Sequence, residues 1–316
     1  MLDPVELYEL SPQGAAAALV GARTHDRFIM VDLVRGFMDA GGAGRLAAEH
    51  LTNELPTIRV ATFDVDRLLD YRSHRPAMTF DVDRWVDYSE PALVLDLIHD
   101  GQGVPFLLLH GIEPDVQWER FIKAVKLLVA QLEVNLVVSV HGVPMNVPHT
   151  RPIGTTMHGT NPDLVTNERV FFSRVSVPSS VSALLEYRLG QSGIDAGGIM
   201  VHVPHYLAGL DYPATALAGL NRLGLAMELD FKTGALELAA EASQPEVEHR
   251  ISENEEIAEL VSLLEREYDT RAAELRTNLL ADLPTADEIA QQVEQFLATQ
   301  PENDKQPEND NQHNRE

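Results

Sequence analysis

The sequence has 316 residues, of which 49 are acidic and 24 are lysine or arginine, so its formal net charge is −25. We expect neither nucleic acid nor an anionic membrane surface as a partner, because both bind basic proteins. The chain has no cysteine, which excludes disulfides and Cys-ligated zinc and fits a cytoplasmic location. We also expect no signal peptide and no membrane-spanning helix, because the start of the chain lacks a basic segment and no apolar run reaches about 18 residues.

Apolar runs and helical periodicities predict an α/β order along most of the chain. The expected strands are 27–34, 57–63, 78–82, 92–98, 104–109, 135–140 and 197–203, and the expected helices are 42–55, 118–132, 179–189 and 213–223. Asp100-Gly101 is a turn signal between two of these strands, and it predicts a β-hairpin. We therefore expect an α/β fold whose sheet is mixed rather than purely parallel.

The C-terminal region differs from the rest in charge, because residues 246–316 contain 19 acidic and 6 basic side chains. Ser252 with Glu255, and Thr285 with Glu288, match capping boxes that begin helices, and a helical apolar stripe runs to about residue 280. The pentapeptide QPEND occurs twice, at 300–304 and 306–310, and offers nothing to bury, which predicts disorder. We expect an α/β domain at 1–245, a helical extension at 246–299 and a disordered acidic tail at 300–316. The acidic region is either a docked, solubilising extension or a docking arm for another protein.

Several short motifs, in order along residues 5–235, resemble the proteasome assembly chaperone 2 family. They are G-x-E-P-x-x-x-W from Gly111 to Trp118, PHTRP at 148–152, an aromatic-x-Asp-Ala-Gly turn at 37–41, the segment 72–76 and PHYLA at 204–208. The resemblance implies a three-layer α/β/α fold similar to phosphorylases and peptidase-like hydrolases, often assembled into trimers. It implies no single activity. Bacterial and archaeal members are often labelled ATP-grasp or carboxylate–amine ligases, and the eukaryotic relatives are chaperones of proteasome assembly.

The sequence leads us to expect no cofactor and no metal. Four glycines between the first long strand and its helix suit either an anion or a tight turn: Gly36, Gly41, Gly42 and Gly44. However, the G-x-G-x-x-G spacing and the Lys-Ser/Thr of a P-loop are absent, and the chain has only four lysines, whereas an ATP-grasp ligase needs a lysine that grips phosphate. His202 and His205 form H-x-x-H, but residues three apart on a strand face opposite sides, so we expect hydrogen-bonding histidines rather than metal ligands.

The strongest group of candidate functional residues lies at or just after predicted strand ends, where open α/β sheets bind ligands. The catalytic candidates are Asp39, Glu113, His141 and His149, and the ligand-binding candidates are Gly111, Arg151 and His205. A carboxylate pair with a histidine can perform acid–base chemistry, and Arg151 can clamp a carboxylate or a phosphate. The alternative is that PHTRP is a rigid crossover loop held by an internal Arg–carboxylate pair, because proline on each side fixes the backbone.

Two functional classes remain open. The chain is either an interaction or assembly-chaperone-like protein that acts as a homotrimer, or an enzyme on the same scaffold. The enzyme would be a hydrolase, a transferase or a carboxylate–amine ligase that acts on a small anionic or amide substrate at the strand-end crevice. The lack of lysine, cysteine and metal signatures favours the interaction protein, since such folds host many functions.

Overall fold

The structure is a computed structural model that describes residues 2–165 and 174–281. By internal contacts the chain divides into one unit from Met1 to Glu265 and another from Arg266 to Glu316. The described part of the second unit is the end of one helix, and the sheet belongs entirely to the first unit. No helix among the described residues is both long and apolar enough to cross a membrane.

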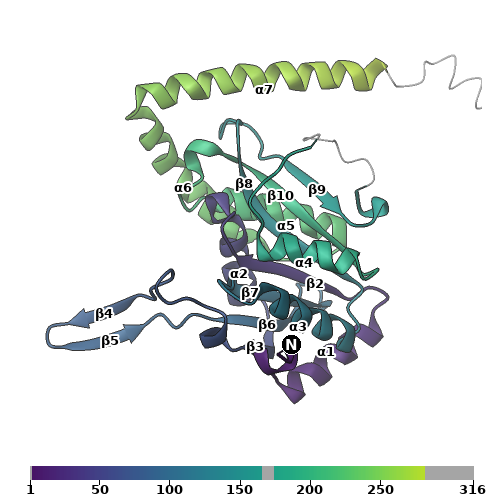
Figure 1. Ribbon diagram of the computed structural model, residues 1–316. Coiled ribbons are helices and arrows are strands. Elements are labelled where there is room, and N and C mark those ends of the chain that lie inside the picture. Colours follow the sequence, from purple (N-terminus) through teal and green to yellow (C-terminus); the bar gives the residue numbers. More distant parts are fainter. Residues whose placement is uncertain (1, 166–173, 282–316) are drawn as a thin grey trace, which may run out of the picture. The chain divides into compact units, whose positions relative to one another are not determined.

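An eight-stranded sheet forms the middle layer of the first unit, with strands in the order β1-β3-β6-β7-β2-β8-β10-β9 (Figure 1). These strands are β1 (Tyr8–Leu10), β2 (Ile29–Arg35), β3 (Thr57–Phe63), β6 (Leu93–His99), β7 (Pro105–Ile112), β8 (Leu136–Met145), β9 (Thr155–Gly159) and β10 (Asp195–Pro204). The four central strands run parallel, whereas β1, β3, β6 and β9 pair antiparallel with their neighbours. The predicted hairpin at Asp100-Gly101 joins β6 to β7, so the mixed sheet is confirmed.

Helices cover both faces of the sheet, which confirms the three-layer α/β/α arrangement. The helices are α1 (Pro12–Thr24), α2 (Ala43–Glu54), α3 (Trp118–Gln131), α4 (Val181–Gly190), α5 (Pro213–Met227), α6 (Gly234–Ser252) and α7 (Glu255–Ala281). Apolar residues of α1, α3 and α4 form one core cluster with the sheet, and those of α2, α5 and the start of α6 form another on the opposite face. Short 3-10 turns lie at Pro4–Leu7, Ala40–Gly42, Val65–Arg67, Pro162–Val165 and His205–Leu207.

The buried pattern explains why these elements form. The residues that α3 buries recur along one helical face, and they are Phe121, Ile122, Ala124, Val125, Leu128 and Val129. In β2, by contrast, five consecutive residues from Ile29 to Leu33 are buried, as expected of a central strand with a helix layer on each side. The central part of the sheet therefore has little exposed surface, and candidate sites lie at its edges and at the strand ends.

Five elements lie outside those that the sequence pattern predicts: β1, α1, β5 (Arg84–Tyr88), β9 and α6. The capping box predicted at Ser252 is wrong. Ser252 ends α6, and its hydroxyl donates to the His249 carbonyl, while Asn254 caps α7 by accepting a hydrogen bond from the Ile257 N–H at 3.2 Å. The capping box predicted at Thr285 and the predicted disordered tail lie outside the described residues.

The C-terminal helices begin as part of the first unit. Val247 and Ile251 of α6 and Val261 of α7 form a small apolar cluster with Leu207 and Tyr212. The predicted limit at 245/246 falls inside α6, and the limit at 299/300 lies outside the described residues. The division into three predicted segments therefore stays a prediction.

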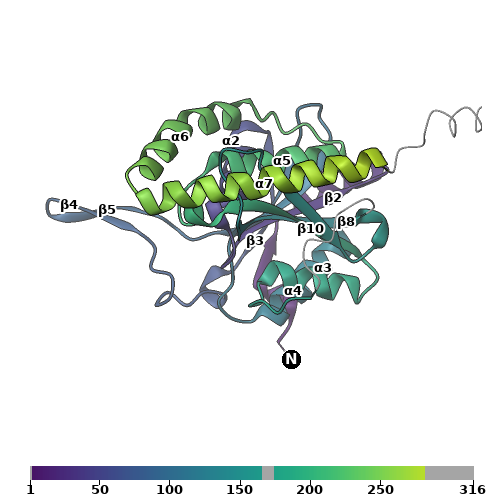
Figure 2. The ribbon, with the colours of Figure 1, turned by 90° about the horizontal axis from the view of Figure 1, so that it is seen from above.

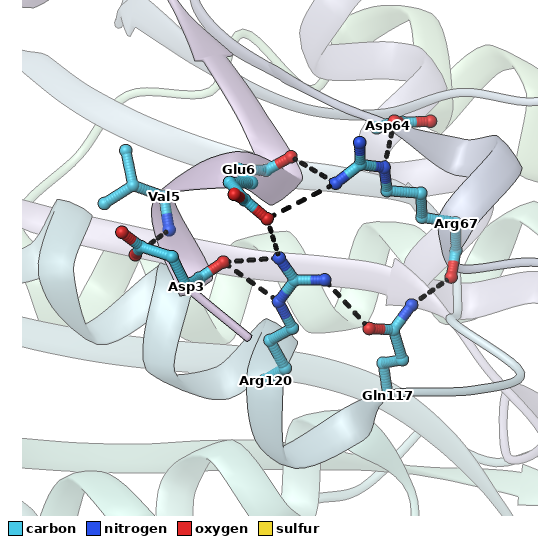
Figure 3. A network of polar contacts seen from close by, with 7 residues as sticks. All are labelled: Asp3, Val5, Glu6, Asp64, Arg67, Gln117 and Arg120. Atoms are coloured by element: carbon cyan, nitrogen blue, oxygen red, sulfur yellow. Dashed lines mark hydrogen bonds and ion pairs between the residues drawn. The ribbon is translucent and has the colours of Figure 1, made fainter. Parts of the chain in front are cut away.

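A polar network ties the N-terminal segment to α3 (Figure 3). Arg120 donates to the Asp3 carbonyl and pairs with the Glu6 carboxylate at 2.8 Å, and its side chain is mostly buried. Arg120 also donates to the Gln117 side chain, whose amide donates to the Arg67 carbonyl. The guanidinium thereby bonds a backbone carbonyl, a side-chain amide oxygen and a carboxylate at once, which fixes the first residues against the body of the protein.

A separate two-stranded hairpin, β4 (Met78–Asp81) and β5, is inserted between β3 and β6. In both views it extends away from the main sheet (Figure 1 and Figure 2). Every residue from Ala77 to Glu90 is exposed, apart from the half-buried Val86. The hairpin therefore contributes nothing to the core of the unit and presents both of its faces to the surroundings.

Candidate functional site

A cavity of about 460 Å³ lies on the sheet beside the ends of β2 and β7. Its other walls are α2 and the two segments, 74–77 and 89–92, that lead into and out of the β4–β5 hairpin. Leu33, Ala48 and Ile112 give it an apolar floor. Pockets of roughly 300–1,000 Å³ with apolar walls and a few polar groups are typical of small-ligand sites. We name this hollow the β2–β7 cavity.

The β2–β7 cavity contains more positive than negative side chains. Its charged lining residues are Arg35, Arg45, Arg75, Glu49 and Glu90. Arg45 is already engaged, because it pairs with Glu49 at 2.8 Å and also with Asp211. Among the described residues, neither Arg35 nor Arg75 has an ion-pair partner. Two arginines without an ion-pair partner among the described residues thus line this cavity, in a chain whose formal charge is −25.

A histidine on β7 connects the cavity to a buried carboxylate on β6. His110 lines the cavity, and its Nε2 lies 2.8 Å from Asp96 Oδ2, while Arg59 Nε approaches Asp96 Oδ1 at 2.5 Å. Burial of Asp96 raises the pKa of its carboxyl, but the hydrogen bonds and charges of His110 and Arg59 outweigh burial, so this pKa lies below its ordinary value. The ionised carboxylate can only accept, so His110 Nε2 carries the proton. A histidine oriented in this way can serve as a general base through Nδ1.

Asp39 and the neighbouring glycines shape the start of α2. The Asp39 carboxylate accepts hydrogen bonds from the N–H groups of Gly44 at 2.7 Å and Arg45 at 3.0 Å. Gly41 and Gly42 have φ angles of 68° and 65°, the left-handed region in which glycine is favoured. The carboxylate therefore occupies the helix N-terminus, where an external anion would otherwise bind.

Glu113 and Gly111 also have internal contacts. Glu113 follows β7, and its carboxylate accepts from the Phe37 N–H at 3.2 Å and from the Val181 N–H at 2.6 Å, which links the segment after β2 to the start of α4. Gly111 has a φ of 121°, and a Cβ atom there would lie 2.0 Å from the Ala92 carbonyl oxygen. Only glycine allows β6 and β7 to approach this closely.

His141 lies within β8, facing β10 and β9. Its ring centroid is 6.2 Å from that of His158, whose Nδ1 lies 3.1 Å from Glu186 Oε1. Burial, together with the His158 ring, lowers the pKa of His141 to about 4. His141 is therefore neutral at physiological pH. The related H-x-x-H histidine His202 makes a 2.8 Å hydrogen bond with Thr156.

The PHTRP segment is held by partners from later parts of the chain. The backbone N–H and the Nδ1 atom of His149 each lie 2.9 Å from the Tyr206 hydroxyl, and burial lowers the pKa of His149. Arg151 Nη1 lies 3.4 Å from Glu265 Oε1, with both side chains about one-third exposed. His205 Nδ1 lies 3.4 Å from the Met145 carbonyl oxygen.

The predicted site residues are not gathered around one of the three main cavities in the described part of the chain. Gly111 lines the β2–β7 cavity, Asp39 lines a second cavity of about 570 Å³, and His149 lines a third of about 440 Å³. Glu113, His141, Arg151 and His205 line none of these three. Within the described residues, no group of three or more histidine or carboxylate side chains is arranged to hold a metal. The catalytic and binding roles of the seven candidates stay predictions.

The profile of the PAC2 family matches residues 33–251, which is more than half of the chain. The chain belongs to the PAC2 family. A Mycobacterium tuberculosis protein of unknown function is 42% identical, with 87% of this chain and 92% of that chain covered and a TM-score of 0.79. A Corynebacterium glutamicum protein of unknown function is 33% identical, with 85% and 99% covered and a TM-score of 0.78. A proteasome-assembly chaperone homologue from M. tuberculosis shares the fold at 23% identity, with 74% and 100% covered and a TM-score of 0.67. No curated protein matches the sequence.

The chemically best-equipped residues of this PAC2-family chain are ones that sequence reasoning missed. Asp96 lies in the run LVLDLIH and His110 at the end of FLLLH, and an acidic residue inside a buried strand is a signal because a buried charge needs a partner. Arg35 has no such signal, and Arg75 is marked only by its place in segment 72–76, which resembles a family motif. They are 40 residues apart in sequence, and only the path of the chain around the hairpin brings both to the cavity.

Proposed function

We propose that this PAC2-family chain acts by binding other protein chains, as an assembly-chaperone-like protein of the cytoplasm that works as a homo-oligomer. The fold that it shares with a proteasome-assembly chaperone homologue supports the first part of the proposal. The observation that carries it is the β4–β5 hairpin, which extends away from the sheet (Figure 1) and carries exposed apolar and aromatic side chains.

The hairpin has the composition of an interface rather than of a solvated loop. Phe80 and Trp85 stack edge-to-face across the two strands with ring centroids 5.0 Å apart, yet Trp85 remains 63% exposed. Met78, Val82 and Tyr88 are also exposed, Val82 to 90%. Contiguous apolar patches of this kind mark interaction sites on soluble proteins, and aromatic residues are enriched in interfaces.

The partner that we propose for the hairpin is a second copy of this chain, within a homotrimer. A two-stranded hairpin alone is only marginally stable in water, so this one needs a surface to cover its rings. Soluble homo-oligomers usually close into cyclic symmetry, and each copy in a ring supplies one arm and one receiving surface. The negative charge of the chain opposes association, but salt at physiological strength confines this repulsion to about 8 Å.

Light scattering coupled to size-exclusion chromatography tests this proposal directly. We expect the wild-type chain to have a mass near three times 34.9 kDa at micromolar concentration, and we expect Trp85→Asp to shift the mass toward the monomer. Val20→Asp on α1 is the matched control, because Val20 is also 63% exposed, and it should keep the wild-type mass. A wild-type monomer refutes the homo-oligomer, and an unchanged mass in Trp85→Asp refutes the role of the hairpin.

We also propose that the acidic C-terminal region contacts a second kind of protein. The support is its composition alone, since 13 more acidic than basic side chains lie between 246 and 316. A deletion that tests this must leave Val247, Ile251 and Val261 in place, because these residues are buried. The suitable comparison is therefore the intact chain against one that ends at 281. Equal recovery of every partner from a native lysate by both chains would contradict a partner contact through residues 282–316.

An enzyme is the second candidate function, favoured by the His110–Asp96 pair at the β2–β7 cavity. A general-base histidine beside a cavity suits hydrolysis or group transfer on a small anionic or amide substrate. We expect any turnover of para-nitrophenyl esters to be lost in His110→Gln. The exposed His249 on α6 supplies the control, and His249→Gln should keep the rate. Equal rates in both variants would remove this candidate.

A further inference from the structure

We propose that the β2–β7 cavity binds a small organic monocarboxylate, whose carboxylate group is held between Arg35 and Arg75. The inference rests on the charges and walls of the cavity and is independent of the role proposed for the hairpin. Arg35 ends β2, and Arg75 lies in the segment that leads from β3 into the hairpin. The two arginine residues therefore line the cavity from two different walls.

Arg35 and Arg75 differ from Arg45, the third arginine of the cavity, because Arg45 already has carboxylate partners. Arg45 is held by Glu49 and Asp211, so its charge is already neutralised inside the protein. Arg35 and Arg75 have no carboxylate partner among the described residues, although the chain has about twice as many acidic as basic side chains. A guanidinium presents a planar fork of donors that matches a carboxylate, and such charge-assisted bonds are roughly twice as strong as neutral ones.

The charge of the cavity indicates how much negative charge its ligand carries. Three arginines and two glutamates line the cavity, and the charges of these five side chains sum to +1. One carboxylate neutralises this charge, whereas a phosphate ester, with a charge of about −1.5 to −2 at neutral pH, exceeds it. Glu90 would repel the excess, whereas Glu49 is paired with Arg45. The charge balance therefore favours a monoanion.

The walls indicate what the rest of the ligand is. A volume of about 460 Å³ is too large for an inorganic ion and suits an organic molecule. Leu33, Ala48, Pro76 and Ile112 offer apolar surface to the body of such a molecule. His110, whose Nε2–H is committed to Asp96, leaves Nδ1 as an acceptor for a hydroxyl or amide group. The ligand is thus a carboxylic acid with an apolar or aromatic body. It has at most one hydrogen-bond donor, which faces His110.

Fluorine NMR titration of the full-length protein with para-fluorobenzoate tests the inference, with para-fluorobenzyl alcohol as the uncharged analogue and para-fluorophenyl phosphate as the dianion. We expect saturable binding of the benzoate and at least about tenfold weaker binding of the alcohol, since a hydrogen bond to a charged group contributes about 1.5–3 kcal/mol. The decisive variant is Arg75→Gln, because Arg75 lines this cavity and not the neighbouring one that Arg35 shares. It should weaken the benzoate about tenfold. Arg35→Gln should do the same.

Arg84→Gln is the matched control. Arg84 lies on the exposed β5 strand, lines none of the three cavities and lacks an ion-pair partner among the described residues. Thermal unfolding and light scattering on each variant show whether fold and mass are kept. The inference is overturned if the benzoate shows no saturable binding, if the alcohol binds equally well, or if Arg75→Gln behaves like Arg84→Gln. Tighter binding of the phosphate ester than of the benzoate overturns the assignment of a monocarboxylate. The masses from light scattering test the proposed homo-oligomer, and the affinities from NMR test the cavity, so the two proposals can fail separately.

Discussion

Asp32 offers a test of the energetics of the sheet, because it is a carboxylate in the middle of β2 that is only 3% exposed. Burial raises the pKa of Asp32 to about 6, and the nearby charge of Glu113 adds to the rise. Hydrogen bonds to the Asp32 carboxylate oppose it. The Val34 N–H donates at 3.1 Å, and the Ser182 side chain hydrogen-bonds to the carboxylate as well. The balance leaves Asp32 ionised and poorly solvated at neutral pH.

The size of the effect of Asp32 on stability follows from proton linkage. The ordinary pKa of an aspartate is 3.8, so between about pH 4 and pH 6 the folded protein holds a proton that the unfolded chain releases. Because the folded-state pKa is the higher one, this contribution to stability is present at low pH and is lost as the pH rises through 6. A pKa difference of about 2 corresponds to about 3 kcal/mol of lost stability above that pH.

We therefore expect Asp32→Asn to stabilise the protein by about 3 kcal/mol at pH 8, because the amide oxygen still accepts from Val34 and no charge is buried. The gain should be about 1 kcal/mol smaller at pH 5.5. Urea unfolding followed by circular dichroism at pH 5.5, 6.5 and 8 measures both quantities. A variant that is less stable than wild type at pH 8, or whose gain does not change with pH, would refute the reasoning.

Asp96→Asn is the matched control, and we expect it to change the free energy of unfolding in the opposite direction. Asp96 is equally buried, at 2% exposure, but it accepts from Arg59 and His110, and its pKa lies below the ordinary value. The side-chain NH2 group of an asparagine at this position would face a donor group of Arg59 or His110, where a carboxylate oxygen now accepts. We expect Asp96→Asn to destabilise the protein by about 1–2 kcal/mol at pH 8, a modest loss because Arg59 is half-exposed. Stabilisation by both substitutions would show that burial alone decides the outcome.

Two further predictions concern the Arg151–Glu265 pair and the last residues of the chain. Arg151→Met should lower the free energy of unfolding by only about 1 kcal/mol, because the Arg151–Glu265 pair is about one-third exposed on both sides; an unfolding midpoint above that of wild type would favour a ligand-clamping role instead. Deletion of residues 300–316 should leave the thermal midpoint unchanged, since this segment has no large apolar side chain to bury. A drop of several degrees in a differential scanning calorimetry trace would show that the segment docks.

The central fold could be predicted from the sequence because burial on two faces leaves a direct signal. The expected strands 27–34, 135–140 and 197–203 correspond to β2, β8 and β10, and the expected helix 118–132 to α3. Edge elements have a weaker signal. β1 has three residues and β9 has five with a partly polar sequence, and their pairing is decided by neighbours distant in sequence. Tertiary contacts, rather than local preference, form them.

The candidate site was harder to predict, and strand length is one physical reason. β8 extends to Met145 rather than ending near residue 140, so His141 lies within the strand and packs against its neighbours instead of facing a strand-end crevice. β7 likewise runs to Ile112, which places His110 and Gly111 inside the ladder. An apolar run shows where a strand is buried, but hydrogen bonding continues through the polar residues that follow it.

The place of β2 in the sheet has a consequence for the newly made chain. β2 ends at Arg35, yet its two neighbours are completed only at Ile112 and Met145, roughly 80 and 110 residues later. At about 5–20 residues per second, β2 remains without one or both neighbours for about 6–22 s after its own synthesis. During that interval its unpaired edges are open to other chains. Slow translation between β2 and β8 should therefore lower the soluble yield of the protein more than slow translation after β10.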